Sequence, residues 1–228
     1  MARWRKLTNP LALAVLGMLV SGPMHPYQIA HVLKHRGKDE TFKIRYGSLY
    51  TVVQDLEKRG LVEAEGTVRA GHRPERTVYR LTAEGRAELD DRLRELLSEP
   101  VKEYPVFAAV LSLMAELRPD EVAALLRDRL AKLQVDIAAT RAAIEEAVVG
   151  QHLPRIFLVE TEYGLAIKQA EADWVRELIR DLTEGARPDI KQWRAWHETG
   201  EFPQELLDTD WAQADLAILT RQEVEEPD

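Results

Sequence analysis

Small and polar residues recur on one side of the segment that runs from Tyr46 to Arg59. Gly47, Thr51, Gln54 and Lys58 fall on one face when successive residues turn by about 100°, as they do in a helix. Thr51 and Gln54 carry donor and acceptor atoms that can reach base edges, and a glycine lets the backbone approach a partner closely. This chemistry suits a helix that enters the major groove of DNA, although any surface helix carries polar residues opposite its apolar side.

Further polar groups surround the start of the same segment. Lys43 and Arg45 add positive charge, while Ser48 and Tyr50 place hydroxyl groups near the backbone N–H groups of the first helical turn. Such a helix start can hold a phosphate group. Tyr50 could equally be a core residue whose hydroxyl group reaches the surface.

Residues 69–76 combine three arginines and one histidine with a glycine and a proline that favour a turn. The flanking segments 61–68 and 77–81 carry β-branched and aromatic residues in partial alternation, which predicts the two strands of a hairpin. His72, Arg73 and Arg76 would then lie where a wing meets the DNA backbone or an adjacent minor groove. Arginines in a hairpin loop are also often simply solvated.

Together these patterns give one set of candidate DNA-binding residues: Lys43, Arg45, Tyr46, Gly47, Ser48, Tyr50, Thr51, Gln54, Lys58, His72, Arg73 and Arg76.

Other groups of residues in the sequence give weaker indications of a functional site. His31 and His35 are four residues apart, a spacing that can bind a metal, but no third ligand is apparent and Lys34 and Arg36 add positive charge. The chain has no G-x-S-x-G, G-x-x-x-x-G-K or G-x-G-x-x-G pattern and no cysteine. We therefore expect no enzyme activity, no metal site and no cofactor. The lack of cysteine fits a reducing cytoplasm.

The elements that must position these residues follow one another in a recognisable order. Hydrophobic spacing predicts helices over 9–20, 26–35, 46–59 and 83–97, with a polar connector over 38–44 and the two strands before the last helix. Leu49, Val52, Val53 and Leu56 form an apolar stripe opposite the polar face of the third helix, and Leu89, Leu93 and Leu96 form one on the fourth. Three helices, a hairpin and a helix are the order of a winged helix-turn-helix domain. Such a domain can bind DNA, or serve in protein interaction without touching DNA.

The charge is divided between two parts of the chain. Residues 1–90 contain 15 Lys and Arg against 10 Asp and Glu, a net of +5, whereas the remaining 138 residues contain 16 against 29, a net of −13. This division indicates two modules with different partners. Pro100 and Pro105 mark the predicted boundary, which gives a DNA-binding domain over 1–99, a helical dimerisation domain over 106–184 and a partly helical extension over 185–228.

The N-terminus resembles the start of a secretory signal, because Arg3, Arg5 and Lys6 precede an apolar run over 11–20. However, Asn9-Pro10 favours a helix start, and the run is about half of the roughly 20 residues that span a bilayer. We expect a buried first helix and no membrane segment.

The acidic part of the chain predicts two long helices, over 119–149 and 154–182, that pair as an antiparallel hairpin. An apolar helix over 106–117 precedes them, and one more helix over 187–196 follows. The long stripes exceed what one thin hairpin can bury, so they favour a dimer, with packing inside one chain as the alternative. The candidate dimerisation residues are Leu126, Leu133, Ile137, Tyr163, Ile167, Trp174 and Leu178.

Four tryptophans concentrate in this part of the chain: Trp174, Trp193, Trp196 and Trp211. Aromatic rings can line a site for a planar effector, but they are more often anchors of a core or an interface.

Several spaced blocks of the first hundred residues resemble one known family. They are Leu11–Leu19, Gly22-Pro23-Met24-His25-Pro26-Tyr27-Gln28-Ile29, Tyr46-Gly47-Ser48-Leu49-Tyr50, Leu56-Glu57-Lys58-Arg59-Gly60-Leu61-Val62 and Tyr79-Arg80-Leu81-Thr82-Ala83-Glu84-Gly85. Over residues 9–97 the chain resembles the PadR family of bacterial transcriptional regulators, and the Leu117-Arg118-Pro119-Asp120 stretch and long helices resemble its larger AphA-type members. The resemblance implies a homodimeric winged-helix regulator, commonly a repressor, whose C-terminal helices form the dimer.

The expected fold class is therefore mainly α, with an N-terminal winged helix-turn-helix domain and a C-terminal antiparallel helical dimerisation domain. The expected function is repression of transcription by a cytoplasmic homodimer on a pseudo-palindromic operator in double-stranded DNA. Release from DNA by a small aromatic effector is a further expectation that the resemblance suggests.

Overall fold

The computed structural model describes residues 7–42, 44–68, 76–184, 188–210, 212 and 213. The chain forms two compact units, an N-terminal unit over residues 1–103 and a C-terminal unit over residues 104–228. Among the helices described, none is both long enough and apolar enough to cross a membrane.

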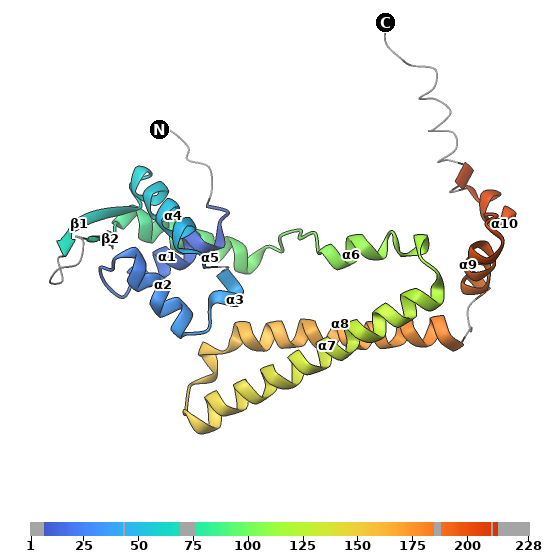
Figure 1. Ribbon diagram of the computed structural model, residues 1–228. Helices are drawn as coiled ribbons and strands as arrows, with labels where there is room; N and C mark the ends of the chain where they lie inside the picture. The colour runs from blue at the N-terminus through green and yellow to red at the C-terminus, as the bar shows by residue number, and fades with distance from the viewer. Residues whose placement is uncertain (1–6, 43, 69–75, 185–187, 211, 214–228) are drawn as a thin grey trace, which may run out of the picture. The chain divides into compact units, whose positions relative to one another are not determined.

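The N-terminal unit consists of packed helices with a small antiparallel hairpin at one edge (Figure 1). Its elements are α1 (Pro10–Leu19), α2 (Pro26–His35), α3 (Asp39–Phe42), α4 (Tyr46–Lys58), β1 (Val62–Val68), β2 (Arg76–Leu81) and α5 (Ala83–Ser98). The predicted mainly helical fold with a two-stranded wing is confirmed. One detail is wrong, because the segment predicted as a polar connector over 38–44 contains the short helix α3, whose Phe42 packs against the core.

Local chemistry fixes where these helices begin. The Asn9 side chain accepts a hydrogen bond from the Leu11 N–H, and Pro10 occupies the first helical position of α1. At the start of α2, His25 Nδ1 accepts from the Gln28 N–H while the Gln28 side chain accepts from the His25 N–H, at 3.0 and 3.1 Å. This reciprocal capping box stabilises the turn that leads into α2.

The core of the N-terminal unit draws on almost every element. Helix α1 is buried along most of its length, and α2 contributes Ile29, Ala30 and Leu33. The predicted stripe of α4 points inward, with Leu49, Val53 and Leu56 buried and Val52 packed at the edge. Only the first residue of the predicted α5 stripe is buried, because Leu93 and Leu96 remain more than one-third exposed.

The base of the wing is tied to the helices by backbone contacts. Met24, in the turn before α2, exchanges two hydrogen bonds of 3.0 Å with Tyr79 of β2. A β-bulge between Ala64 and Gly66 lies just beyond this pair on the loop side. At the other end of β2, Thr82 Oγ1 donates to the Gly60 carbonyl at 2.8 Å and accepts from the Gly85 N–H at 3.0 Å.

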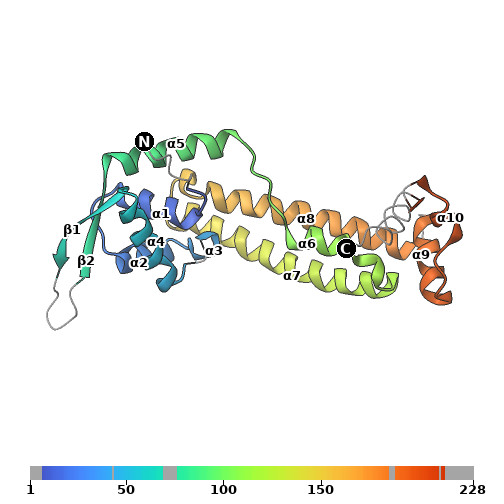
Figure 2. The ribbon, with the colours of Figure 1, turned by 90° about the horizontal axis from the view of Figure 1, so that it is seen from above.

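The C-terminal unit is built on a long antiparallel pair of helices (Figure 2). Its elements are α6 (Val106–Leu111), the 3₁₀ turn η1 (Met114–Glu116), α7 (Pro119–Glu145), the π-helical turn η2 (Glu146–Gly150), the 3₁₀ turn η3 (Arg155–Phe157), α8 (Val159–Glu184), α9 (Pro188–Thr199) and α10 (Gln204–Leu207). The sequence overestimates the regularity of three helices. The helix predicted over 106–117 already ends at Leu111. Helix α7 continues as a π-helical turn after Glu145, and α8 begins at Val159 rather than at Pro154.

A small core holds one end of the helical pair together. Val122, Ala123 and Leu126 of α7 pack with Val175 and Leu182 of α8. Helix α9 adds Ile190 and Trp193, and the Trp193 Nε1–H donates to the Ala115 carbonyl at 3.0 Å. Residues beyond the second long helix are therefore part of this core.

Candidate DNA interface

The predicted polar face of α4 lies on the surface of the N-terminal unit. Arg45, Tyr46, Gly47, Ser48, Tyr50, Thr51, Gln54 and Lys58 are all exposed. The helix presents them outward because its opposite side is anchored in the core by Leu49, Val53 and Leu56. The geometry of α4 thus leaves its small and polar residues available to a partner.

The first turn of α4 has no side-chain cap. Arg45 occupies the N-cap position in an extended conformation, and it makes no capping hydrogen bond. The N–H groups at the start of a helix then lack an intrahelical acceptor and carry partial positive charge. With Arg45 beside them, they form a site of the right sign for a phosphate group.

Two residues of the face have distinct local roles. The Thr51 hydroxyl donates to the Gly47 carbonyl at 3.1 Å, so its free hydrogen-bonding capacity is as an acceptor. A Cβ atom placed on Gly47 would meet no other atom within 4 Å. The absence of a side chain there is therefore not required by packing inside the described structure, and it leaves an open approach to the backbone of α4.

The wing is described only at its base. Arg76 is half-buried at the start of β2, and its guanidinium group lies 4.9 Å from the centre of the Tyr27 ring. Lys43, His72 and Arg73 lie outside the described residues, so their predicted DNA contacts remain predictions.

Sequence reasoning missed an aromatic cluster beside α4. Tyr27 stacks on Tyr46 with ring centres 5.5 Å apart and planes 11° apart, and His31 stacks near Tyr27 at 6.4 Å. Lys34 lies over the Tyr46 ring at 4.7 Å. The available signal was spacing, because positions 27, 31 and 34 repeat at four and three residues and share one face of α2.

Two titratable side chains near this cluster, those of His25 and Tyr79, have shifted pKa values. Burial, and then the neighbouring positive charge of Arg76, lower the pKa of His25 below the usual imidazole range, while a backbone hydrogen bond acts in the opposite sense. Burial, followed by the Glu57 carboxylate that accepts its hydroxyl hydrogen, raises the pKa of Tyr79. The Glu57 contact joins the outer end of α4 to the wing strand β2.

The histidine pair on α2 has no third ligand among the residues that the structure describes. His31 is engaged in the ring stack, and the described residues contain no group of three His, Asp or Glu side chains that could hold a metal ion.

Comparison with known proteins is decisive for the N-terminal unit. Residues 15–91 match the model of the transcriptional regulator PadR-like family. An uncharacterized curated protein of Lysinibacillus sphaericus is 31% identical over 103 residues, which are 45% of this chain and 84% of that protein. The chain belongs to the PadR-like family of transcriptional regulators.

Solved structures of the PadR-like family share the fold beyond this region. Bacillus subtilis PadR in complex with operator DNA superposes with a TM-score of 0.63 at 20% identity, covering 75% of this chain and 98% of PadR. The same protein in complex with p-coumaric acid gives a TM-score of 0.61 at 19% identity, with the same coverage. The Vibrio cholerae virulence activator AphA gives 0.59 at 19% identity, covering 77% of this chain and 99% of AphA. About a quarter of this chain therefore has no counterpart in these structures.

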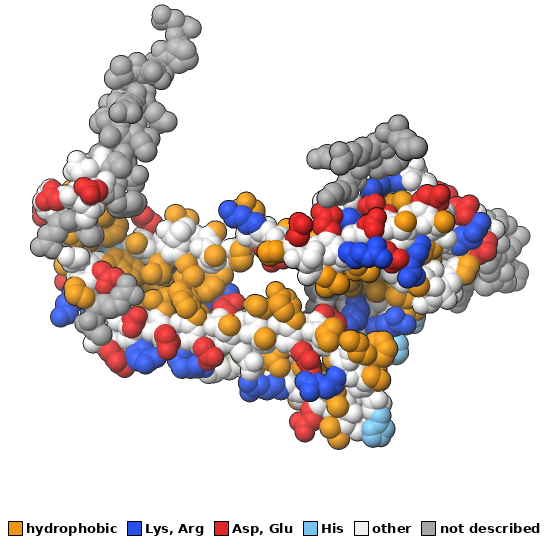
Figure 3. Space-filling model, turned by 180° about the vertical axis from the view of Figure 1, so that it is seen from behind, with side chains coloured by type: hydrophobic (Ala, Val, Ile, Leu, Met, Phe, Trp, Pro, Cys, Tyr) orange, Lys and Arg blue, Asp and Glu red, His pale blue; other side chains and the backbone are white. Residues whose placement is uncertain are grey.

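The predicted dimerisation residues of this PadR-like protein divide into two groups. Leu126 and Ile137 are buried within the chain, and Leu133 and Leu178 are half-buried. Tyr163, Ile167 and Trp174 of α8 are 70%, 51% and 48% exposed. Figure 3 shows hydrophobic side chains at the surface of the helical pair, between groups of charged residues.

Two tryptophans of the C-terminal unit share their surroundings, because Trp193 and Trp196 belong to the same core and both contact the His197 ring. Trp193 is buried in the core, Trp196 contacts Phe202 edge to face, and Trp174 contacts Phe107 edge to face. Trp211 lies outside the described residues. Trp193 and Trp196 are therefore packing anchors of this core, whereas Trp174 is 48% exposed.

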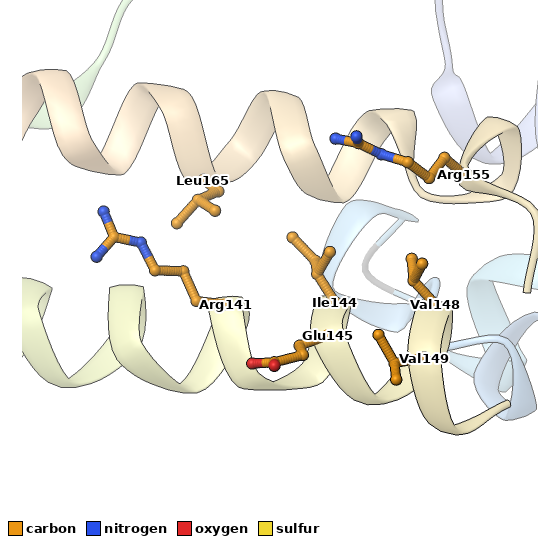
Figure 4. Close-up of a pocket in the computed structure, with 7 residues that line it drawn as sticks. All are labelled: Arg141, Ile144, Glu145, Val148, Val149, Arg155 and Leu165. Atoms are coloured by element: carbon orange, nitrogen blue, oxygen red, sulfur yellow. The ribbon is translucent and has the colours of Figure 1, made fainter. Parts of the chain in front are cut away.

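A shallow cleft of about 260 Å³ lies at the turn between the two long helices (Figure 4). Arg141, Ile144 and Val148 point from one side toward Leu165 and Arg155 on the other. The Arg155 guanidinium donates twice to one carboxylate oxygen of Glu162, at 2.8 and 2.6 Å. The cleft thus combines apolar side chains with the guanidinium group of Arg141 and the carboxylate of Glu145. Arg141 forms no ion pair with any carboxylate in the described part of the chain.

Proposed function

We propose that this protein is a homodimeric repressor that binds a pseudo-palindromic operator through α4 and the wing of each protomer. The observation that carries the proposal is the two-sided construction of α4, which is anchored in the core along one face and open along the other. In this assignment residues 1–99 bind DNA, residues 106–184 make the dimer, and residues 185–228 extend it.

Each part of the α4 surface has a role in this function. Gln54 and Thr51 contact base edges in the major groove, and Lys58 contacts the backbone further along the helix. Arg45, Ser48 and the uncapped N–H groups of the first turn hold a phosphate. His72, Arg73 and Arg76 grip the backbone from the wing.

A dimer is supported by the hydrophobic side chains that a single chain leaves exposed. Tyr163 and Ile167 lie one turn apart on α8, so they form a continuous apolar strip. Burial of such a strip against its own copy gives a two-fold interface, which presents two winged units to two half-sites. Half-sites one helical turn apart are spaced by about 34–36 Å.

The charge division supports the same assignment. The net charge of +5 over residues 1–90 attracts the DNA backbone, and the net charge of −13 over the remainder keeps the helical part away from it.

A glycine substitution separates DNA binding from folding. Gly47→Ala adds one methyl group that meets nothing in the free protein, and alanine favours a helix interior over glycine by roughly 1 kcal/mol. We expect unchanged or increased thermal stability together with weaker retardation of DNA from the region upstream of the protein's own gene. Gly17→Ala is the matched control, because Gly17 is also an exposed helical glycine with open space around it. Equal DNA affinity for both variants would contradict the proposed approach of α4.

The base-contacting role of Gln54 has its own test. Gln54→Ala should change which base is preferred at one position of each half-site, at a cost of about 1–3 kcal/mol for the original base. Footprinting and competition with single-base variants of the operator measure this. A uniform loss on every sequence would instead assign Gln54 to the backbone. A winged-helix module that binds only proteins would retard no fragment even at low salt.

Regulation by a small aromatic carboxylate completes the proposal. It is supported by the PadR relative that binds p-coumaric acid and by the cleft in which Arg141 faces apolar side chains. We expect p-coumarate, as a probe, to release the protein from its operator in a retardation assay. A reporter driven by that operator tests repression, which matters because the AphA relative is a virulence activator.

A further inference from the structure

Four side chains in the N-terminal unit form a continuous row in which two stacked aromatic rings lie between two cations. Lys34 lies over the Tyr46 ring at 4.7 Å, Tyr46 stacks on Tyr27 at 5.5 Å, and Arg76 lies over the Tyr27 ring at 4.9 Å. The row joins three separate elements, because Tyr27 and Lys34 belong to α2, Tyr46 begins α4, and Arg76 begins β2.

The ring faces fix the two cations without neutralising them. Contact with an aromatic face restrains a long cationic side chain, and it leaves the positive charge in place. Within the parts of the chain that the structure describes, neither Lys34 nor Arg76 forms an ion pair with a carboxylate. The rings themselves remain open to solvent, since Tyr27 is 43% and Tyr46 is 40% exposed.

The row is continuous with the start of α4. Tyr46 is the first residue of this helix, directly before Gly47 and directly after Arg45. The first turn of α4, whose N–H groups carry partial positive charge, therefore includes the ring that Lys34 covers, and Arg76 lies at the far end of the same stack. A purely structural role would account for the contact of Arg76 with Tyr27, which holds the base of the wing. It gives no reason for a second uncompensated cation on the Tyr46 ring.

We propose that Lys34, held on the Tyr46 ring at one end of the stack that also restrains Arg76, is a further contact for DNA backbone phosphates, which extends the interface from the wing to the C-terminal end of α2. The inference rests on the proposed function, because it requires that the protein binds duplex DNA. The polyanionic backbone is the partner that matches an ordered row of positive charges at this place.

The test is the salt dependence of operator binding by the full-length protein. Each phosphate contact changes the slope of log K against log salt by about 0.9. Lys34→Gln should therefore reduce the magnitude of the slope by about 0.9 for each protomer bound, and Lys34→Gln combined with Arg76→Gln by about twice as much. Arg86→Gln is the matched control, because it removes one charge from α5 of the same unit, where Arg86 pairs with Asp90. We expect the slope of this control to equal that of the wild type.

The ring platform has a separate test. Tyr27→Phe keeps the aromatic face and should bind as the wild type does, whereas Tyr27→Leu should bind roughly two- to fivefold more weakly. Thermal melts of both Tyr27 variants show whether Tyr27→Leu is still folded. If Tyr27→Leu does not fold, the salt dependence of Lys34→Gln still tests the proposal. A slope for Lys34→Gln equal to that of the wild type would overturn the phosphate site while leaving the DNA-binding function intact. Failure of the wild type to bind any duplex would instead remove both proposals.

Discussion

The two units of the chain conceal their hydrophobic side chains to different extents. In the N-terminal unit, α1, α2, α4, β1 and α5 all contribute to one core. In the C-terminal unit, α6 has no buried residue, and α8 buries only Ala172, Val175 and Leu182 over its whole length. Val106 and Tyr163 of this unit are 80% and 70% exposed.

The difference indicates which unit is complete within one chain. A large apolar surface left in water is unfavourable, and monomeric proteins rarely keep it. The N-terminal unit leaves fewer large apolar side chains exposed, among them Leu93, Leu96 and Leu97 of α5, and it presents the polar face of α4 outward. The C-terminal unit presents apolar groups, which a second copy of the chain would cover.

The largest effect is expected from a charge placed on the exposed apolar strip of α8, because this charge tests whether a second copy of the chain covers the strip. Ile167→Glu would place two carboxylates in the proposed dimer interface, and we expect it to weaken dimerisation by on the order of 4 kcal/mol, which is about a thousandfold. Sedimentation velocity over a range of protein concentrations measures the change. The control Ile167→Leu keeps the apolar character and should remain dimeric. A glutamate variant that dimerises like the wild type would place the interface elsewhere.

A second substitution acts on the N-terminal unit alone. A Cβ atom on Gly85 would overlap the Leu61 carbonyl oxygen and crowd the Leu81 side chain, both of which are held by the packing of the wing against α5. Gly85→Ala should therefore lower the free energy of unfolding of this unit by about 3 kcal/mol. Denaturant melts followed by circular dichroism test this, with Gly17→Ala as the control that meets open space. Because the effect belongs to one unit, the oligomeric state should not change.

The smallest expected effect is a dependence of the stability of the N-terminal unit on pH. The pKa of His25 is lowered in the folded unit, so the unfolded chain binds a proton more readily in the window below 6.5. Stability should fall as the pH drops through this window and the imidazole nitrogen that accepts the Gln28 N–H becomes protonated. His25→Asn retains a capping side chain but cannot titrate, so the difference in stability between the two proteins should be constant at high pH and should change as the pH falls below 6.5. Urea melts on either side of pH 6.5 measure it, and parallel curves for the two proteins would show that the cap does not titrate.

The sequence predicts most of what depends on neighbours along the chain. The spacing of Leu49, Val53 and Leu56 fixes which side of α4 is buried, and with it the exposed position of Gln54 and Lys58. The caps at Asn9 and Thr82 are also evident from residue type.

What the sequence does not predict depends on residues far apart in the chain. Arg92 is buried because its Nε–H donates to the carbonyl of Leu7, 85 residues away, and helical periodicity contains no trace of that contact. The stack of Tyr27 on Tyr46 likewise requires α2 and α4 to be placed before it can be seen. The breaks after Leu111 and Glu145 occur within apolar, helix-favouring stretches, so local preference points the wrong way there.

The pair of hydrogen bonds between Met24 and Tyr79 acts as a clasp at the base of the hairpin. Fraying of the ladder from the Val68–Arg76 pair must stop at Tyr79, because the Tyr79 amide hydrogen is released only when the turn before α2 also opens. Just beyond these hydrogen bonds, the bulge between Ala64 and Gly66 increases the local twist of the two strands. The amide hydrogen of Tyr79 should accordingly exchange with solvent deuterium as slowly as the amides of the core helices, and more slowly than the amides of an exposed hairpin.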